Sequence, residues 1–257
     1  MAAVLRGRRW LRAAVIGAMA ALGCLDDGRS AAAQPLVADL SDHLVAITAG
    51  FTGTDVLLFG AVEGEGDVVV VIRGPERDVT IRRKGRLGGI WVNRVELTFS
   101  RAPMYYFVAT SRPLADLGPP ALLQRHGIGL DHLKLEEEEA VNPVELAAFR
   151  AGFIRNKQRE DLYYKEPGKV AFLTGRLFRT DIYFPANVPT GTYAVEVFLI
   201  RQGEIVSAQT TPLVVSNVGI GADVFLFAHR YSLLYGIVAI AMALFAGWSA
   251  SAAFRRA

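Results

Sequence analysis

The carboxyl-terminal segment constrains this chain more than any other part. Residues 231–254 are 24 consecutive positions without a charged side chain, and Arg230 and Arg255 flank them. As an α-helix this run is roughly 36 Å long, enough to cross a hydrocarbon core of about 30 Å. The sequence therefore predicts one membrane-spanning helix over 231–254 and a cytoplasmic tail at 255–257.

The amino-terminal segment has the layout of a secretory signal. Four arginines between residues 6 and 12 precede an apolar stretch at 13–25, and Ala31-Ala32-Ala33 fits a small-residue cleavage site. We therefore expect residues 1–33 to be removed on export. Two alternatives stay open: Arg8-Arg9-Trp10-Leu11 has features of a twin-arginine signal, and Ala21-Leu22-Gly23-Cys24 has features of a lipoprotein signal.

The two ends together predict the topology. Because positively charged flanks tend to stay in the cytoplasm, Arg255 and Arg256 are expected to hold the carboxyl terminus inside. Residues from about 34 to 228 then lie outside the membrane. This indicates a single-pass protein of the bacterial inner membrane with the bulk of the chain in the periplasm.

Charge and cysteine content argue against a nucleic-acid-binding protein and against a disulfide-stabilised domain. The chain has 28 Lys and Arg against 25 Asp and Glu, but residues 1–33 hold five and two of these, which leaves 23 of each. This balance argues against nucleic-acid binding. Cys24 is the only cysteine and lies in the expected signal, so the exterior part depends on its apolar core rather than on disulfides.

Short apolar runs separated by turn residues fill residues 34–112, which we expect to form an amino-terminal β domain. The expected strands are Leu44–Ile47, Asp55–Val62, Val68–Arg73, Val79–Arg83, Val95–Phe99 and Tyr105–Thr110. Runs of this length and composition are typical of an immunoglobulin-like antiparallel sandwich. They leave no room for the crossovers that a parallel sheet needs.

Residues 113–165 change to a helical pattern. Asn142 can cap a helix that has Pro143 at its first position and Glu145 in a capping box. The expected apolar face consists of Leu146, Phe149, Phe153 and Ile154, and the other faces carry Arg150, Arg155, Lys157 and Arg159. We expect this helix to pack on the strands, and a membrane-surface helix is the alternative.

Strands return over residues 166–222. Gln202-Gly203 separates the runs 192–201 and 204–215 and so predicts a hairpin, entered through a turn from Pro185 to Tyr193. The helical stretch is either an insertion in one sandwich or a linker between two small β units, and we favour the linker.

Several of these segments together resemble a known family. The motifs are Phe51-Thr52-Gly53, Phe59-Gly60, Arg73-Gly74-Pro75, Arg82-Arg83-Lys84, Gly89-Ile90-Trp91, Leu177-Phe178-Arg179, the turn from Pro185 to Tyr193, Tyr235-Gly236 and Gly247-Trp248. In combination they are similar to the alphaproteobacterial putative transmembrane protein family over nearly all of the mature chain. The resemblance implies an exported bacterial protein with one span, and it supplies no catalytic residues.

The sequence carries no recognisable catalytic or metal-binding motif. His126 and His132 lack the spacing of a helical metal pair, and Asp39, Asp42 and His43 lack the Gly-x-Ser-x-Gly elbow of a hydrolase. No phosphate-binding or dinucleotide-binding glycine pattern occurs. We therefore expect neither an enzyme nor a bound metal or other cofactor.

A basic stretch is the candidate binding site of the exterior part. Its expected ligand-binding residues are Arg73, Arg82, Arg83, Lys84 and Trp91. Guanidinium groups and an aromatic plane suit an anionic ligand, a lipid headgroup or an acidic protein surface. The alternative is an edge strand that its charges protect from aggregation. Because side chains alternate along a strand, residues 82–84 cannot form one flat patch.

The span carries a ridge of small side chains at Ala239, Ala243, Gly247 and Ser251. Such a ridge lets helices approach closely in lipid, so it predicts contact with an integral membrane protein or with a second copy of the chain. The leading hypothesis is thus a membrane-anchored periplasmic accessory protein that acts by binding beside an integral membrane partner such as a transporter. A receptor or scaffold for an anionic envelope ligand is the alternative, and a periplasmic enzyme is the third.

Overall fold

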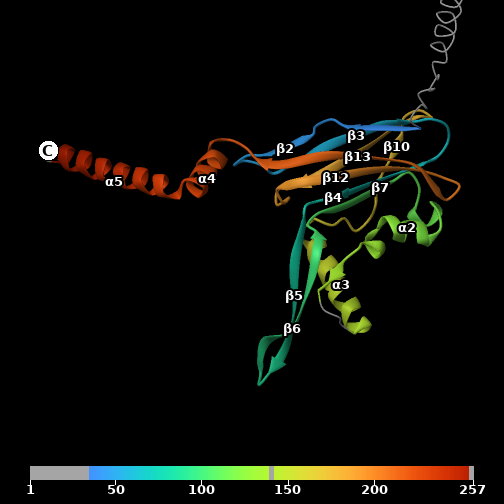
Figure 1. The fold of residues 1–257 in the computed structure, drawn as a ribbon, viewed down its shortest axis with the longest axis horizontal. Coiled ribbons are helices and arrows are strands. Elements are labelled where there is room, and N and C mark those ends of the chain that lie inside the picture. Colours follow the sequence, from blue (N-terminus) through green and yellow to red (C-terminus); the bar gives the residue numbers. More distant parts are fainter. Residues whose placement is uncertain (1–34, 139–141, 255–257) are drawn as a thin grey trace, which may run out of the picture. The chain divides into compact units, whose positions relative to one another are not determined.

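Two β-sheets hold most of the strands in the computed structural model, which describes residues 35–138 and 142–254 (Figure 1). The first sheet consists of β1 (Leu36–Leu40), β3 (Gly53–Val62), β11 (Leu177–Pro185) and β10 (Ala171–Phe172), in that order. The second consists of β2 (Leu44–Ile47), β13 (Glu204–Asn217), β12 (Gly191–Arg201), β4 (Asp67–Arg73), β7 (Tyr106–Thr110) and β9 (Gly168–Lys169). The fold is mainly β, as predicted, whereas the expected signal and tail lie outside the described residues.

The strand pairing corrects the expectation of two separate β units. β3 pairs with β11, and β4 pairs with β12, so both sheets combine strands from before and after the helical stretch. The helical stretch is therefore an insertion in one two-sheet unit. Most strand pairs are antiparallel, and two edge strands differ, because β2 runs parallel to β13 and β9 runs parallel to β7.

Three aromatic rings lie at the centre of the core. Tyr105 stacks on Phe184 at 5.2 Å between ring centroids, and both rings meet Tyr193, at 5.6 and 5.7 Å. The hydroxyl of Tyr193 donates to the carbonyl of Pro189 at 2.6 Å. This bond fixes the predicted turn before β12 in the manner of the tyrosine corner of immunoglobulin-like domains.

The insertion covers the outer face of β4 and β7. Residues 68–72 of β4 are completely buried, which matches their unbroken apolar run. The cover consists of η1 (Leu114–Asp116), α2 (Pro120–His126) and η2 (Leu130–His132), whereas α3 (Pro143–Arg159) packs on a separate hairpin, with 5.7 Å between the ring centroids of Phe153 and Phe99. The hydroxyl of Tyr106 joins the sheet to this cover, since it donates to the carbonyl of Gly127 at 2.7 Å and accepts from the amide of Gly129 at 2.8 Å.

The predicted helix over α3 is confirmed, with two corrections. Asn142 caps it by accepting from the amide of Val144 at 3.0 Å. Glu145 pairs with an arginine of the neighbouring hairpin instead of completing a capping box. Lys157, expected on the polar face, is buried and reaches Glu160 at 3.1 Å, because a lysine can bury its aliphatic stem while its ammonium keeps a partner.

A third sheet contains a long hairpin, which we call the arm. It consists of β5 (Glu76–Leu87) and β6 (Ile90–Pro103), joined through Gly88 and Gly89, and β8 (Glu136–Glu137) pairs only with residues 99–100 of β6. Both glycines have positive φ, +58° and +89°, as a two-residue hairpin turn requires. Beyond its base the arm extends away from the two sheets as a two-stranded ribbon (Figure 1).

The last two helices are α4 (Ile220–Arg230) and α5 (Ser232–Phe254). The part of α5 from Ser232 to Ser251 is long and apolar enough to cross a membrane, in agreement with the predicted span. α4 was not expected. Its exposed Phe225 and Phe227 lie within five residues of His229 and Arg230, a mixture typical of a helix at a membrane surface.

Candidate functional site

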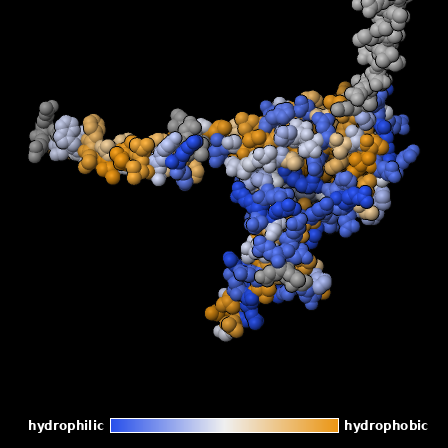
Figure 2. All heavy atoms as spheres, in the orientation of Figure 1, coloured by the Kyte–Doolittle hydropathy of each residue, from blue (hydrophilic) through white to orange (hydrophobic). Residues whose placement is uncertain are grey.

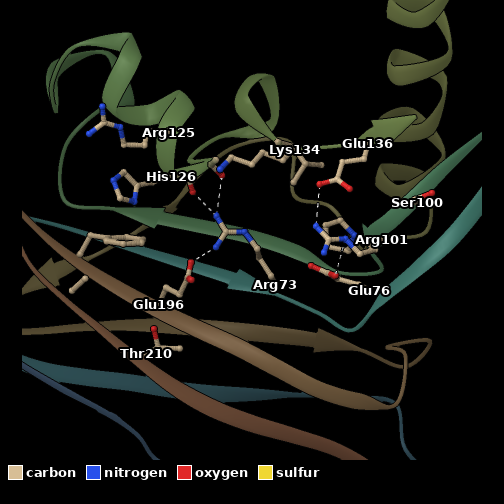
Figure 3. Close-up of a pocket in the computed structure, with 15 residues that line it drawn as sticks. Arg73, Glu76, Ser100, Arg101, Arg125, His126, Lys134, Glu136, Glu196 and Thr210 are labelled. Atoms are coloured by element: carbon tan, nitrogen blue, oxygen red, sulfur yellow. Dashed lines mark hydrogen bonds and ion pairs between the residues drawn. The ribbon is translucent and has the colours of Figure 1, made fainter. Parts of the chain in front are cut away.

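An open cavity of about 460 Å³ lies where the insertion meets the second sheet and the base of the arm (Figure 3). Its charged lining residues are Arg73, Glu76, Arg101, Arg125, Lys134, Glu136 and Glu196. His126, Phe198 and Thr210 complete much of the remaining wall. Charged groups from β4, β5, β6, α2 and β12 thus meet around one cavity, which we call the charged cavity.

Arg73 lies at the centre of the charged cavity. Its guanidinium makes an ion pair with Glu196 and donates to the backbone carbonyls of His126, at 2.6 Å, and Gly127, at 3.3 Å (Figure 3). Only about a quarter of the Arg73 side chain is exposed. The arginine therefore fastens the end of α2 to the sheet while it contributes positive charge to the cavity.

Arg101 is held at the cavity rim by an irregular backbone. It has φ of +50°, lies in a β-bulge in which Ser100 and Arg101 oppose the single residue Asp78, and its amide donates to Asp78 at 3.0 Å. Its guanidinium donates to Glu136 at 3.0 Å and lies 3.9 Å from Glu76. A bulge can redirect a side chain in this way, which explains why a strand residue contributes to the site.

The cavity has a surplus of positive charge. It holds four Arg or Lys side chains and three Glu side chains, and Arg73 and Arg101 pair with all three glutamates. Within residues 35–138 and 142–254 no ion pair involves the two other cations, Arg125 and Lys134. Arg73 and Lys134 both lie next to Gly127, at the end of α2. A Cβ atom added to this glycine would lie 3.3 Å from Arg73 Nη2 and 4.0 Å from Lys134 Cγ.

A second, more apolar cavity of about 490 Å³ lies on the other side of the insertion, against Val108, Leu114 and Tyr164. Tyr106 lines it. Burial raises the pKa of Tyr106 to about 12, although the nearby Arg73 opposes the shift. The phenol therefore stays protonated at neutral pH and keeps its two hydrogen bonds to the insertion.

The structure separates the predicted ligand-binding residues into two groups. Arg73 lies in the charged cavity, whereas Arg82, Arg83, Lys84 and Trp91 lie on the arm. Arg82 pairs across the arm with Glu96 at 3.0 Å, and Arg83 pairs with Glu145 of α3 at 2.7 Å. These two arginines thus have partners within the chain. The cavity residues Arg101, Arg125 and Lys134 were missed, because they are scattered in sequence and only the strand pairing brings them together.

The histidines singled out in the sequence do not meet. His126 lines the charged cavity and packs edge-on against Phe198 at 5.4 Å, whereas His132 lines the apolar cavity. His43 pairs with Asp39 at 3.0 Å on an exposed turn. Across the described residues no group of three or more His, Cys, Asp or Glu side chains could hold a metal ion.

The four small residues of the ridge, Ala239, Ala243, Gly247 and Ser251, all lie in α5 and recur every four positions. None of the 18-residue window that marks the span is buried against another part of the chain. The ridge therefore lies on a helix surface that is open to lipid or to another membrane helix.

Comparison with known proteins gives one result. The model of a family described as "Putative transmembrane protein (Alph_Pro_TM)" matches residues 35–256, which covers the two sheets, the insertion, the arm and the span. No curated protein matches the chain.

Proposed function

The chain belongs to this family of transmembrane proteins, and from that membership and the charged cavity we propose that it is a membrane-anchored accessory protein. The two-sheet domain binds a small anion on the periplasmic side, and the protein works beside an integral membrane partner. In this role the protein acts by binding and catalyses no reaction.

The unpaired cations of the charged cavity support the anionic ligand. Arg73 and Arg101 already neutralise the three glutamates that line the cavity, so an arriving anion meets Arg125 and Lys134, which have no ion-pair partner within residues 35–138 and 142–254. Guanidinium and ammonium groups are the usual partners of carboxylate and phosphate oxygens. A cavity of about 460 Å³ has the size of a small-molecule site. The favoured ligand is a small organic anion with a carboxylate or phosphate group.

The exposed span supports the membrane partner. An anchor needs only an apolar helix, whereas α5 also presents small side chains at Ala239, Ala243, Gly247 and Ser251 on one surface. A receptor that binds the anion without any partner is the second candidate function, and the charged cavity supports it equally.

Ligand binding is tested on the full chain in lipid nanodiscs. A thermal-shift screen of small carboxylates and phosphates selects a ligand, and calorimetry measures its dissociation constant. Replacing Arg125→Gln and Lys134→Gln together should weaken binding by about tenfold or more, because charge-assisted hydrogen bonds are lost. Arg155→Gln, which removes an exposed charge from α3, is the control and should leave the affinity unchanged. Equal affinities in all three proteins would contradict the proposal.

The partner is tested by purification in mild detergent followed by mass spectrometry of the bound proteins. Stoichiometric recovery of one integral membrane protein supports the accessory role, and recovery of the chain alone favours the receptor. Substrate turnover that is lost on His126→Ala would contradict both and indicate an enzyme.

A further inference from the structure

The tip of the arm exposes large apolar side chains that nothing in the described chain covers. Leu87, Ile90 and Trp91 are 61%, 65% and 64% exposed, although they flank a well-formed two-residue turn. Figure 2 shows this hydrophobic end bordered by hydrophilic surface. Contiguous exposed apolar groups of this kind mark a contact with a protein or a membrane.

Positive charge surrounds these apolar side chains. Residues 84–94 contain Lys84, Arg86 and Arg94 but no Asp or Glu. All three cations are exposed, and Arg86 lies over the ring of Trp91 at 5.5 Å. The Arg94 side chain packs directly on Gly85 of the opposite strand. A Cβ atom added to this glycine would lie only 2.4 Å from Arg94 Cδ. The tip therefore combines apolar groups with a basic border.

Cross-strand pairing places these groups on both faces of the ribbon. Arg86 is opposite Trp91 on one face, and Leu87 is opposite Ile90 on the other. A protein surface that docks on the Leu87–Ile90 face of the ribbon would leave Trp91 on the other face in water. A bilayer interface can receive both pairs at once, since the end of the ribbon enters it and the cations remain at the phosphates.

We propose that the tip of the arm, residues 84–94, enters the headgroup region of an anionic lipid bilayer. Tryptophan favours this depth of the membrane, and lysine and arginine bind its phosphates. The chain carries its own span, so a bilayer surface is always present at a high effective concentration. The arm then forms a second membrane contact in addition to α5.

The test uses the full chain in nanodiscs, with Cys24→Ser and one new cysteine that carries an environment-sensitive fluorophore. With Ile90→Cys, we expect a blue-shifted emission and at least twofold quenching by spin-labelled lipid when the discs contain phosphatidylglycerol. Thr80→Cys, an exposed position nearer the base of the same arm, is the matched control and should stay unquenched. Equal signals at residues 80 and 90 would overturn the proposal.

The basic border is tested by Lys84→Gln, Arg86→Gln and Arg94→Gln together in the Ile90→Cys protein. Each lost charge should weaken tip insertion by roughly fivefold, so quenching should fall towards that in phosphatidylcholine discs. The melting temperature checks that the variant is folded. If the folded triple variant is quenched as strongly as the Ile90→Cys protein, anionic lipid does not recruit the tip. A photo-crosslinker at residue 90 that captures a protein in native membranes, with no quenching in discs, would show that the tip docks on a protein instead.

Discussion

Arg82 and Arg83 are adjacent in the chain but differ in what they contact. Arg82 reaches Glu96 on the surface of the arm, where both side chains are more than half exposed. Arg83 joins the arm to α3, because it pairs with Glu145 and lies over the ring of Phe149 at 5.7 Å. Surface ion pairs contribute little to stability, whereas an arginine that also packs on an aromatic ring contributes more.

We therefore expect Arg83→Gln to lower stability by about 1 kcal/mol, which corresponds to roughly 2–4 °C in melting temperature for a domain of this size. Arg82→Gln should change it by less than about 0.5 kcal/mol. Thermal unfolding of the full chain in detergent measures both. Glu145→Gln should reproduce the loss, and combining it with Arg83→Gln should add little. Equal losses for Arg82→Gln and Arg83→Gln would show that Arg83 does not brace the arm.

Alkaline pH should destabilise the fold through its buried tyrosines. Burial raises the pKa of Tyr106 and of Tyr164 from 10.0 to about 12, and it also raises the pKa of Tyr105, Tyr163 and Tyr193. Above pH 10 the unfolded chain loses these protons while the folded chain keeps them. The stabilising contribution of Tyr106 and Tyr164 is thus complete below pH 10 and is lost as the pH rises through about 12.

The melting temperature should accordingly fall steeply above pH 10. Tyr106→Phe should be less stable at pH 7 by about 1–2 kcal/mol, because the buried amide of Gly129 loses its partner and the carbonyl of Gly127 keeps only the longer bond from Arg73. The melting temperature of this variant should fall less between pH 10 and 11 than that of the unchanged protein. If the melting temperatures of the two proteins fall equally between pH 10 and 11, the ionisation of Tyr106 is not coupled to unfolding.

Single residues were predictable from the sequence where their role is local. Asn142 at a helix start and the glycine of Gln202-Gly203 follow from backbone geometry within a few residues. The charged cavity could not be predicted, since Arg101 enters it through a bulge and Arg125 through the packing of α2. The sequence grouped Arg73 with residues 82–84 because they are close along the chain, although strand β5 carries the latter away from the cavity.

At the scale of elements, the ridge on α5 makes a prediction about membrane contacts. Gly247→Leu should separate α5 from a neighbouring helix, whereas Leu244→Ile on a different face should not. Such contacts are worth on the order of 1 kcal/mol, so the single change should weaken association and Ala243→Leu with Gly247→Leu should weaken it further. Recovery of cross-linked partner, or of cross-linked dimer, from membranes with equal amounts of each variant measures this. Unchanged recovery in the double variant would reduce α5 to an anchor.

The elements themselves were largely predictable, and the failures have a common cause. β4 and α5 carry unbroken apolar runs, β12, β13 and α3 carry apolar residues at strand or helix spacing, and the expected positions of all five are confirmed. β5 and β6 were expected to be less than half as long, because the outer arm has no buried face and so no apolar alternation to mark it. α4 was missed because its apolar face has no counterpart within the described protein; a membrane surface would provide one.

At the scale of the whole molecule, sheet topology explains why two β units were expected and one was found. The alternation of apolar residues specifies which face of a strand is buried, but not which strand lies beside it. β3 and β11 are separated by the whole insertion and still pair over the length of β11. The charged cavity depends on this long-range pairing, because β4 and β12 bring Arg73 and Glu196 together.

The orientation of the molecule in the membrane is the last prediction. We expect the signal at residues 1–33 to start export and the span to stop it, with Arg255 and Arg256 held in the cytoplasm. Arg230, at the other end of the span, provides a single competing charge. Alkaline phosphatase, which is active only in the periplasm, should therefore be active when fused after Asp223 and inactive when fused after Ala257. Deleting residues 1–33 should abolish the activity at Asp223, since nothing would then start export. Activity of the Ala257 fusion would place the tail outside the cytoplasm and contradict the predicted orientation.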